Sequence, residues 1–348
     1  MKKAVSIALI FTLALSALTG CGGAAASVAP SSSAVVASSA VTASVPAAPR
    51  TAFHIAGLKG PTTMGMVGLM QSADADTARH DYEVTMYGSA DEIVPKIVSG
   101  ELDVAAVPAN LASVLYAKTE GKIKVAAVNT LGVLYVVETG DEVHSIADLA
   151  GKTIYTTGKG TTPEYVLNYL LTANGLDPAT DVTIEYKSEA TEVAAAMQSA
   201  GENVIAMLPQ PYVTALAMKL DNLRVALDMT EEWNRVSPQS GLVTGVLIAR
   251  TAFIEENPLA FDEFLADYKA STEYVNNNVP AAAALIAQYG IVEKAPIAEK
   301  AIPACNITYR AGAEMKASVS GYLKVLFDQN PKAVGGALPD DGFYYHAA

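Results

Sequence analysis

An alternation of short apolar runs with helical stretches, which begins at Thr51 and is then repeated, constrains the fold of this chain more than any other feature. Strands separated by helices of about ten residues form βαβ units around a mainly parallel sheet. The first set of predicted elements has strands at 52–56, 82–87 and 104–107, and helices at 64–72, 90–99 and 111–117. The second set has strands at 152–155, 182–186, 204–208 and 223–228, and helices at 146–149, 163–174, 190–200 and 212–219.

Further apolar runs connect the two sets. Strands are predicted at 124–127 and 132–137, the second leading out of the first unit, and a strand at 241–249 leads back. Beyond Ala249 the pattern predicts helices only, at 251–278, 281–288, 295–301 and 311–329. We therefore expect an α/β protein of two lobes, with residues 51–136 and 246–348 in lobe 1 and residues 137–245 in lobe 2. A ligand would lie between the lobes, outside the carboxyl ends of the strands.

The N-terminus has the features of an export signal. Two lysines precede an apolar run at 4–17, which is followed by Leu18-Thr19-Gly20-Cys21. These last four residues resemble the lipobox of bacterial lipoproteins, in which the cysteine receives a diacylglycerol. A transmembrane anchor is the alternative, but about 17 residues are short for a bilayer core. The resemblance implies a signal peptide at 1–20 and lipid attachment at Cys21.

A segment without charged or aromatic residues follows the cysteine. Residues 22–49 are almost entirely Ala, Ser, Val, Pro, Gly and Thr, a composition that cannot bury a core. We expect residues 21–50 to tether the folded body to the outer face of the bacterial cytoplasmic membrane. The net charge of −13 disfavours nucleic acid as a partner, since phosphate backbones require a basic surface. Nothing in the sequence indicates an oligomer, so a monomer is expected.

The residues that usually carry catalysis or bind metals are sparse. With Cys21 assigned to the lipid, Cys305 is a lone thiol, and the four histidines lack the spacing of zinc ligands. The segment Gly151-Lys152-Thr153 matches the end of a phosphate-binding P-loop, but Ile146 stands where the first glycine is required. No hydrolase elbow or dinucleotide fingerprint is present. We therefore predict no enzyme activity, no cofactor and no metal.

One arrangement occurs at corresponding places in both sets: a strand, a glycine-containing turn, two threonines and a helix N-terminus. The segments are 59–63 (Lys-Gly-Pro-Thr-Thr) and 158–163 (Gly-Lys-Gly-Thr-Thr-Pro). In the second, Thr162 is predicted to cap the helix, with Pro163 at the first helical position. Unpaired N–H groups and hydroxyls at such ends favour an anionic or acceptor-rich ligand group. The alternative is that the threonines only cap their helices.

Other polar residues fall at predicted carboxyl ends of strands. These segments are Tyr87-Gly88-Ser89, Pro108-Ala109-Asn110, Asn129-Thr130 and Pro209-Gln210-Pro211-Tyr212. Asn110 and Gln210 offer both donors and acceptors, which suits a polar ligand held in one orientation. Trp233 and Ser240 precede the return to the first lobe, where a cleft wall is expected. For Trp233 the alternative is a place in the core.

Three further segments complete a resemblance. These are Ser99-Gly100-Glu101-Leu102-Asp103-Val104-Ala105 with Pro108-Ala109-Asn110, Asp148-Leu149-Ala150-Gly151-Lys152-Thr153-Ile154, and Leu208–Tyr212. With the lipobox and Gly158-Lys159-Gly160-Thr161-Thr162, they resemble solute-binding lipoproteins of ABC importers. The group serves nitrate, sulfonates, taurine and thiamin-pyrimidine precursors, and the resemblance runs from residue 51 to the end. It implies a periplasmic-binding-protein type II fold, closure about a double-crossover hinge, and a permease and ATPase as partners. The predicted ligand-binding residues are Thr62, Thr63, Tyr87, Asn110, Gly160, Thr161, Thr162, Gln210, Trp233 and Ser240.

The charge of the predicted cleft limits the solute. No arginine lies in these loops, and Lys59 and Lys159 are the nearby cations. Nitrate, sulfate and phosphate are therefore disfavoured, and we expect a small organic solute, either a mono-anionic sulfonate or carboxylate or a pyrimidine-like compound. Two alternatives stay open at this point. One is an exported enzyme on the same fold, with Cys305 as nucleophile, and the other is a ligand-sensing lipoprotein.

Overall fold

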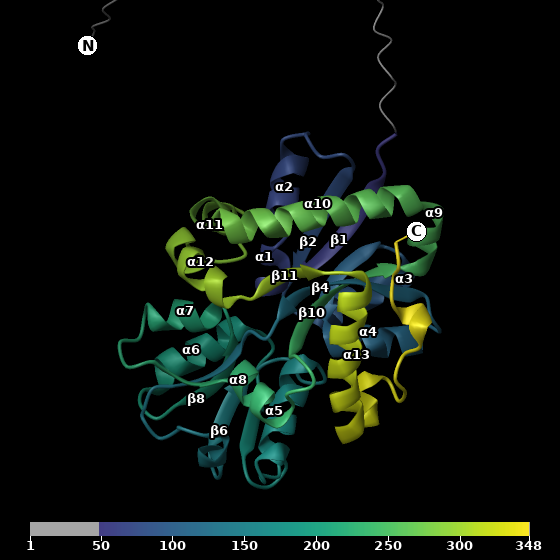
Figure 1. The fold of residues 1–348 in the computed structure, drawn as a ribbon. Helices are drawn as coiled ribbons and strands as arrows, with labels where there is room; N and C mark the ends of the chain where they lie inside the picture. The colour runs from purple at the N-terminus through teal and green to yellow at the C-terminus, as the bar shows by residue number, and fades with distance from the viewer. Residues whose placement is uncertain (1–48, 348) are drawn as a thin grey trace, which may run out of the picture. The chain divides into compact units, whose positions relative to one another are not determined.

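Two β-sheets organise the part of the chain that the structure, a computed structural model, describes: residues 49–347 (Figure 1). The predicted signal peptide, Cys21 and the tether as far as Ala48 lie outside the described residues. The first sheet has the strand order β11-β4-β10-β3-β1-β2. Its strands are β1 (Ala52–Leu58), β2 (Asp81–Tyr87), β3 (Val104–Pro108), β4 (Ile123–Leu131), β10 (Val243–Arg250) and β11 (Ile307–Arg310).

The second sheet has the order β7-β6-β8-β5-β9. Its strands are β5 (Leu134–Glu138), β6 (Thr153–Thr156), β7 (Thr183–Tyr186), β8 (Ile205–Pro209) and β9 (Arg224–Asp228). Each sheet contains three parallel strands followed by an antiparallel one, β10 in the first and β5 in the second. The chain passes from the first sheet to the second between Leu131 and Leu134. It returns between Asp228 and Val243.

Helices cover both sheets. Those that belong to the first are α1 (Pro61–Met64), α2 (Val67–Asp74), α3 (Ala90–Ser99), α4 (Ala109–Lys118), α9 (Thr251–Glu256), α10 (Pro258–Asn277), α11 (Val279–Gln288), α12 (Ala295–Ala301) and α13 (Gly312–Gln329). Those of the second are α5 (Thr162–Ala173), α6 (Ala190–Ala200), α7 (Tyr212–Ala217) and α8 (Met229–Val236). Short 3₁₀ helices span Ile146–Leu149, Ile302–Ala304, Pro331–Val334 and Asp341–Phe343. No helix within residues 49–347 is both long and apolar enough to cross a membrane.

Helix α3 shows how local sequence sets these elements. Ser89 and Glu92 form a capping box at its start, which satisfies free N–H groups of the first turn. Gly100 ends it in the left-handed conformation that glycine adopts without strain. Ile93 and Ile97, four residues apart, are fully buried against the first sheet. The predicted bounds 90–99 agree with those observed because every one of these signals is local.

The prediction of helices only beyond Ala249 is wrong. Strand β11 pairs with β4, which is remote in sequence. The four residues of β11 carry no local signal of this pairing. The single predicted helix at 251–278 is two helices, because Pro258 lacks an N–H group and takes an initial helical position after Asn257. Helix α8 lies where no helix was predicted.

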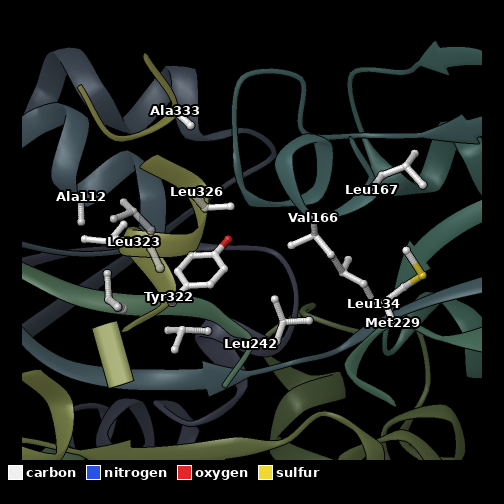
Figure 2. Close-up of a cluster of buried hydrophobic side chains, with 14 of the residues drawn as sticks. Ala112, Leu134, Val166, Leu167, Met229, Leu242, Tyr322, Leu323, Leu326 and Ala333 are labelled. Carbon is white, nitrogen blue, oxygen red and sulfur yellow. The ribbon is translucent and has the colours of Figure 1, made fainter. Parts of the chain in front are cut away.

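One apolar cluster continues from the first sheet into the second. Figure 2 shows Tyr322 and Leu323 of α13 on one side of it, with Val166 of α5 and Met229 of α8 on the other. All four side chains are fully buried. The facing helices therefore bury apolar surface against each other where the two sheets meet, which stabilises this arrangement of the described residues.

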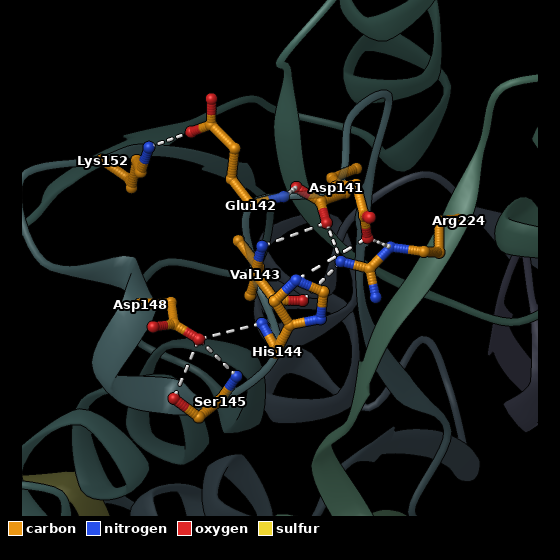
Figure 3. Close-up of polar contacts among 9 residues, drawn as sticks. Asp141, Glu142, Val143, His144, Ser145, Asp148, Lys152 and Arg224 are labelled. Atoms are coloured by element: carbon orange, nitrogen blue, oxygen red, sulfur yellow. Dashed lines mark hydrogen bonds and ion pairs between the residues drawn. The ribbon is translucent and has the colours of Figure 1, made fainter.

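The turn between β5 and β6 is held by polar contacts (Figure 3). Glu138, at the end of β5, is 1% exposed and pairs with Arg224 of β9. Its carboxylate also accepts the N–H groups of Glu142 and Val143, each at 3.2 Å. Hydrogen bonds from His144 and Ser145 hold the pKa of Asp148 below its usual value. These contacts order the segment that leads into the second set of strands and helices.

Candidate functional site

The first threonine pair lies where β1 turns into α1, and its two members have different surroundings. Thr63 is fully buried, and its hydroxyl donates to the carbonyl of Leu58 at 2.6 Å. The Thr62 hydroxyl is buried and has no hydrogen-bond partner among the described residues. The Thr62 carbonyl accepts a hydrogen bond from the Asn129 side-chain amide at 3.3 Å. Thr63 thus closes the turn, whereas the Thr62 hydroxyl takes no part in closing it.

The second pair is arranged differently from the prediction. Thr161 precedes the first turn of α5, and the helix begins at Thr162, so the predicted cap at Thr162 is wrong by one residue. The Thr161 hydroxyl donates to the Gly158 carbonyl at 2.7 Å and thereby orders the turn. Gly160 has φ near +77° and its N–H group donates to Glu164. A residue with a side chain is strained at this φ, which explains the glycine.

Thr162 is the centre of a buried hydrogen-bond network. Its hydroxyl donates to Asn110 Oδ1 at 3.3 Å and accepts from the Tyr322 hydroxyl at 3.3 Å. The Asn110 amide donates in turn to the carbonyls of Ala333, at 3.1 Å, and Gly160, at 3.4 Å. Asn110, Thr162 and Tyr322 are all fully buried. Because Asn110 and Tyr322 belong to α4 and α13 and Thr162 to α5, the network links helices that cover different sheets.

Trp233 and Ser240 are brought together next to this network. The indole N–H of Trp233 donates to the Ser240 carbonyl at 2.7 Å. The ring is fully buried and packs against Tyr169 of α5 and Tyr322 of α13, with centroid separations of 4.8 and 5.5 Å. Trp233 therefore contributes to the core at the junction, and a role in ligand binding stays a prediction.

Two residues of the β8–α7 segment contact neighbouring main chain. The side-chain oxygen of Gln210 accepts from the N–H and hydroxyl groups of Thr214, at 3.2 and 2.8 Å, and so satisfies the start of α7. The Gln210 N–H donates to the Val133 carbonyl at 3.0 Å, in the segment that crosses between the sheets. The Tyr212 hydroxyl donates to the Lys59 carbonyl at 3.4 Å. The loop before α7 therefore contacts the turn that carries the first threonine pair.

Tyr87 lies at the end of β2 and lines a cavity that the other predicted residues do not line. It lines a cavity of about 120 Å³ with His54, Glu83 and Lys96, between β1, β2 and α3. None of the other predicted residues lines this cavity. A second cavity, of about 260 Å³, lies beside Arg50 and Tyr82, and it too lacks the other predicted residues. The Tyr87 carbonyl accepts a hydrogen bond from the Lys59 N–H at 3.0 Å, so its main chain lies beside the turn that carries the first threonine pair.

Two further residues resemble Thr62 in having a buried polar atom without a partner among the described residues. The sequence places both at a strand end, but neither was predicted to bind ligand. Asn129 and Thr130 of β4 are 1% and 0% exposed, and Asn129 Oδ1 and the Thr130 hydroxyl have no hydrogen-bond partner among the described residues. The signal in the sequence is the pair of polar residues that interrupts the apolar run of β4. Because β4 was predicted to end at 127, the pair was interpreted as loop.

The comparison with family models decides which family this chain represents. The model described as "NMT1/THI5 like" matches residues 81–283, more than half of the chain. The chain belongs to the NMT1/THI5-like family. A search of curated proteins gives no match.

Solved structures share the fold of this NMT1/THI5-like chain. An ABC transporter protein from Parabacteroides distasonis has a TM-score of 0.70 at 24% identity, covering 86% of this chain and 100% of that chain. The periplasmic aliphatic sulphonate binding protein SsuA of Escherichia coli has a TM-score of 0.68 at 18% identity, covering 86% and 94%. The nitrate-binding protein NrtA of Synechocystis has 0.62 at 12%, covering 81% and 82%.

These likenesses confirm the predicted fold class. The NMT1/THI5-like chain has the two-lobed α/β periplasmic-binding-protein type II fold, with one sheet in each lobe. The suspected family relationship is confirmed as well. The predicted limits of the lobes, at residues 136/137 and 245/246, stay predictions.

Each of the six arginines of this NMT1/THI5-like chain is paired with a carboxylate. The pairs are Arg50 with Asp76 and Asp81, Arg79 with Glu263 and Asp267, Arg224 with Glu138 and Asp141, Arg235 with Glu231 and Glu232, Arg250 with Asp103, and Arg310 with Glu314. The ammonium group of Lys159 lies over the Tyr186 ring, 5.7 Å from its centroid. The site therefore has no unpaired guanidinium to clamp an oxyanion.

The lone thiol is not arranged as a nucleophile. Cys305 is fully buried, and its Sγ lies 3.8 Å from the sulfur of Met64. Burial raises the pKa of the thiol, and a thiol in apolar surroundings is inert. Among residues 49–347, no three His, Cys, Asp or Glu side chains gather in a way that could hold a metal ion.

Proposed function

We propose that this protein is the solute-binding component of an ABC importer, held by a lipid on Cys21 at the outer face of the cytoplasmic membrane. It captures a small organic solute between the two lobes and delivers it to the permease and its ATPase. The tether raises the effective concentration of the receptor near the permease without any new contact.

The observation that carries this proposal is a set of buried polar atoms without a hydrogen-bond partner among the described residues: the Thr62 and Thr130 hydroxyls and Asn129 Oδ1. They lie at the carboxyl edge of the first sheet, beside the crossing to the second. Ligands of open α/β sheets bind at such edges. A solute that contacts both lobes selects the closed arrangement, so the permease can distinguish a loaded receptor from an empty one. Membership of the NMT1/THI5-like family and the names of the similar structures, which include sulphonate- and nitrate-binding proteins, support the same role.

The paired arginines favour a solute without a double negative charge. A small organic compound, either a mono-anionic sulfonate or carboxylate or a pyrimidine-like molecule, fits a site of hydroxyls and amides. The ten predicted ligand-binding residues stand as part of this proposal. Within them, Thr62 has a buried hydroxyl without a hydrogen-bond partner among the described residues.

Thermal unfolding of the full chain tests the proposal. The protein is unfolded and refolded in detergent to remove carried-over solute, and its midpoint is measured with taurine, sulfonates, amino acids, aromatic carboxylates and thiamin-related pyrimidines. A solute at 100 times its dissociation constant stabilises the folded state by about 2.7 kcal/mol. We expect a concentration-dependent rise with one of these classes. The absence of a rise with all of them contradicts the proposed receptor of a small organic solute.

A further inference from the structure

Three unpaired polar groups lie together on the first lobe. The hydroxyls of Thr62 and Thr130 and the side-chain oxygen of Asn129 are buried and have no hydrogen-bond partner among the described residues. Their side chains belong to residues that are 7%, 0% and 1% exposed. Most buried polar groups in proteins are hydrogen-bonded, and burying one without a partner is unfavourable. Three such groups near the end of β4 make this edge of the first sheet a candidate place for a partner from outside the chain.

Gly245 of β10 lies next to all three side chains. A Cβ atom at this glycine would lie 2.6 Å from Asn129 Oδ1, 2.7 Å from Thr62 Cγ2 and 3.3 Å from Thr130 Cβ. Thr130 pairs with Gly245 in the sheet, and the next residue of β4, Leu131, pairs with Val243. The chain then crosses to the second lobe, where Leu134 pairs with Pro209 beside Gln210. The three groups therefore lie at the end of β4, next to the segment that crosses from the first sheet to the second.

The hydrogen bond to Thr62 fixes which way the Asn129 amide points. Its nitrogen donates to the Thr62 carbonyl at 3.3 Å, so the oxygen is the unpaired atom. An amide oxygen can only accept a hydrogen bond. The two hydroxyls can each donate and accept. The cluster thus requires at least one donor from its partner and can offer donors in return.

No buried charge is left unpaired beside these groups, and Lys59, three residues before Thr62, is exposed. Every arginine is paired with a carboxylate, and the buried charged residues Asp103, Glu138 and Glu232 are paired with Arg250, Arg224 and Arg235. An oxyanion has only acceptors, so an oxygen of it placed against Asn129 Oδ1 would be repelled, and no arginine is left unpaired to offset this repulsion. An uncharged N–H or O–H group meets the same oxygen favourably.

We propose that Thr62, Asn129 and Thr130 form a hydrogen-bonding floor that selects an uncharged solute with at least one N–H or O–H donor, and discriminates against the matching oxyanion. This inference rests on the proposed receptor function and defines the class of its solute. Asn129 sets the preference because it is the acceptor, and the two threonines add affinity.

The test uses sets of probes that share a shape and differ in this one group. Benzamide, benzoate and benzenesulfonate form one set, and propionamide, propionate and ethanesulfonate form another. Binding to the full chain is measured by calorimetry and by the shift of the unfolding midpoint. We expect the amide of a set to bind at least roughly tenfold more tightly than either anion, which is the effect of one well-placed hydrogen bond.

Variants separate binding from folding. Thr130→Val and Thr62→Val keep the shape of the side chain and remove an unpaired hydroxyl, so each leaves the unfolding midpoint unchanged or higher and weakens binding of the amide roughly tenfold. Thr251→Val is the matched control. Its hydroxyl donates to the Gly121 carbonyl at 3.0 Å at the far end of β10, so it lowers the midpoint and leaves affinity unchanged.

The outcomes separate failure of the floor from failure of the receptor. Tighter binding of the anions, or an amide affinity that Thr130→Val and Thr62→Val leave unchanged, overturns the floor and leaves the receptor in place. If no probe binds but a solute of the wider screen does, and that solute carries a negative charge and no N–H or O–H donor, the floor is again overturned. If the solute found in the wider screen is instead uncharged and carries an N–H or O–H donor, the floor is supported. If neither the probes nor any solute of the wider screen binds, both the floor and the proposed receptor function are overturned.

Discussion

Thr162 shows how one hydroxyl can connect two lobes. It donates to Asn110 and accepts from Tyr322, and all three side chains are fully buried. Thr62, at the corresponding place of the first lobe, has no such partners. The two threonine pairs are similar in sequence but therefore have different hydrogen-bonding roles in the described structure. One hydroxyl joins α5 to α4 and α13, and the other has no hydrogen-bond partner among the described residues.

This difference predicts unequal costs of substitution at the network. Thr162→Val leaves Asn110 Oδ1 and the Tyr322 hydroxyl buried without this partner, so we expect a loss of about 2–3 kcal/mol in the free energy of unfolding. Tyr322→Phe leaves the bond between Thr162 and Asn110 intact and should cost about 1 kcal/mol. Urea unfolding of both variants and of the double variant measures these values.

The double variant is the sharper part of that experiment. Removing the Tyr322 hydroxyl also removes one of the two groups that Thr162→Val would leave unpaired, so the double variant should lose less than the combined single losses. Thr161→Val serves as the control, since its hydroxyl bonds only within the turn. Strict additivity of the two substitutions would show that Thr162 does not couple α5 to α13.

Asn110 and Thr162 could be singled out from sequence because they follow predicted strands. Their mutual contact could not, since Tyr322 lies 160 residues from Thr162 in the chain. Nothing local marks a tyrosine inside an amphipathic helix as a hydrogen-bond donor rather than a core side chain. The same limit applies to Thr62, because an unpaired hydroxyl is defined by the absence of contacts that only the folded chain determines.

At the scale of elements, β2 and α10 are joined by a tyrosine and a carboxylate. The Tyr82 hydroxyl donates to Asp267 Oδ2 at 2.8 Å, and Tyr82 is 7% exposed. Burial, and then the hydrogen bond to Asp267, raise the pKa of Tyr82. This contact holds the long helix α10 (Figure 1) against the edge strand of the first sheet.

The raised pKa predicts a pH dependence with a definite sign. The folded-state pKa lies above the value of about 10 in the unfolded chain, so the contribution of Tyr82 is fully present below pH 10 and is lost as the pH rises. The stability difference between the natural protein and Tyr82→Phe should therefore shrink by about 1.4 kcal/mol between pH 8 and pH 11. Urea unfolding at the two pH values measures it. A difference that stays constant or grows would contradict the assignment.

Local signals account for the elements that sequence predicts well. Helix α3 carries its own cap, apolar face and terminal glycine, and its predicted bounds agree with the observed ones. Helix α8 was missed because its eight residues are mostly polar, and its burial depends on Trp233 reaching Tyr169 and Tyr322. Strand β11 was missed because it exists by pairing with β4, which is remote in sequence. The periodicity of a sequence cannot predict elements that form only by contact with residues distant in the chain.

At the scale of the whole molecule, the two segments that cross between the lobes differ in how tightly they pack. A Cβ atom at Gly132, between β4 and β5, would lie 2.0 Å from the Thr230 hydroxyl and 3.1 Å from Leu242. At Gly241, just before β10, a Cβ atom would meet nothing within 4 Å. The first crossing is therefore tightly packed against α8 and Leu242. The second has no side chain packed against Gly241 among the described residues.

This asymmetry predicts that a methyl group at the two crossings has opposite consequences. Gly132→Ala must displace Thr230, which lies in the same helix as Trp233, and overpacking of this kind costs about 1–3 kcal/mol. We expect a lower unfolding midpoint, a larger radius of gyration by small-angle scattering as the lobes separate, and a shift in the emission of Trp233, the single tryptophan. Gly241→Ala should leave all three measurements unchanged. If Gly132→Ala lowers the midpoint while the radius and emission stay the same, the strain is absorbed within one lobe, and this crossing does not set the angle between them.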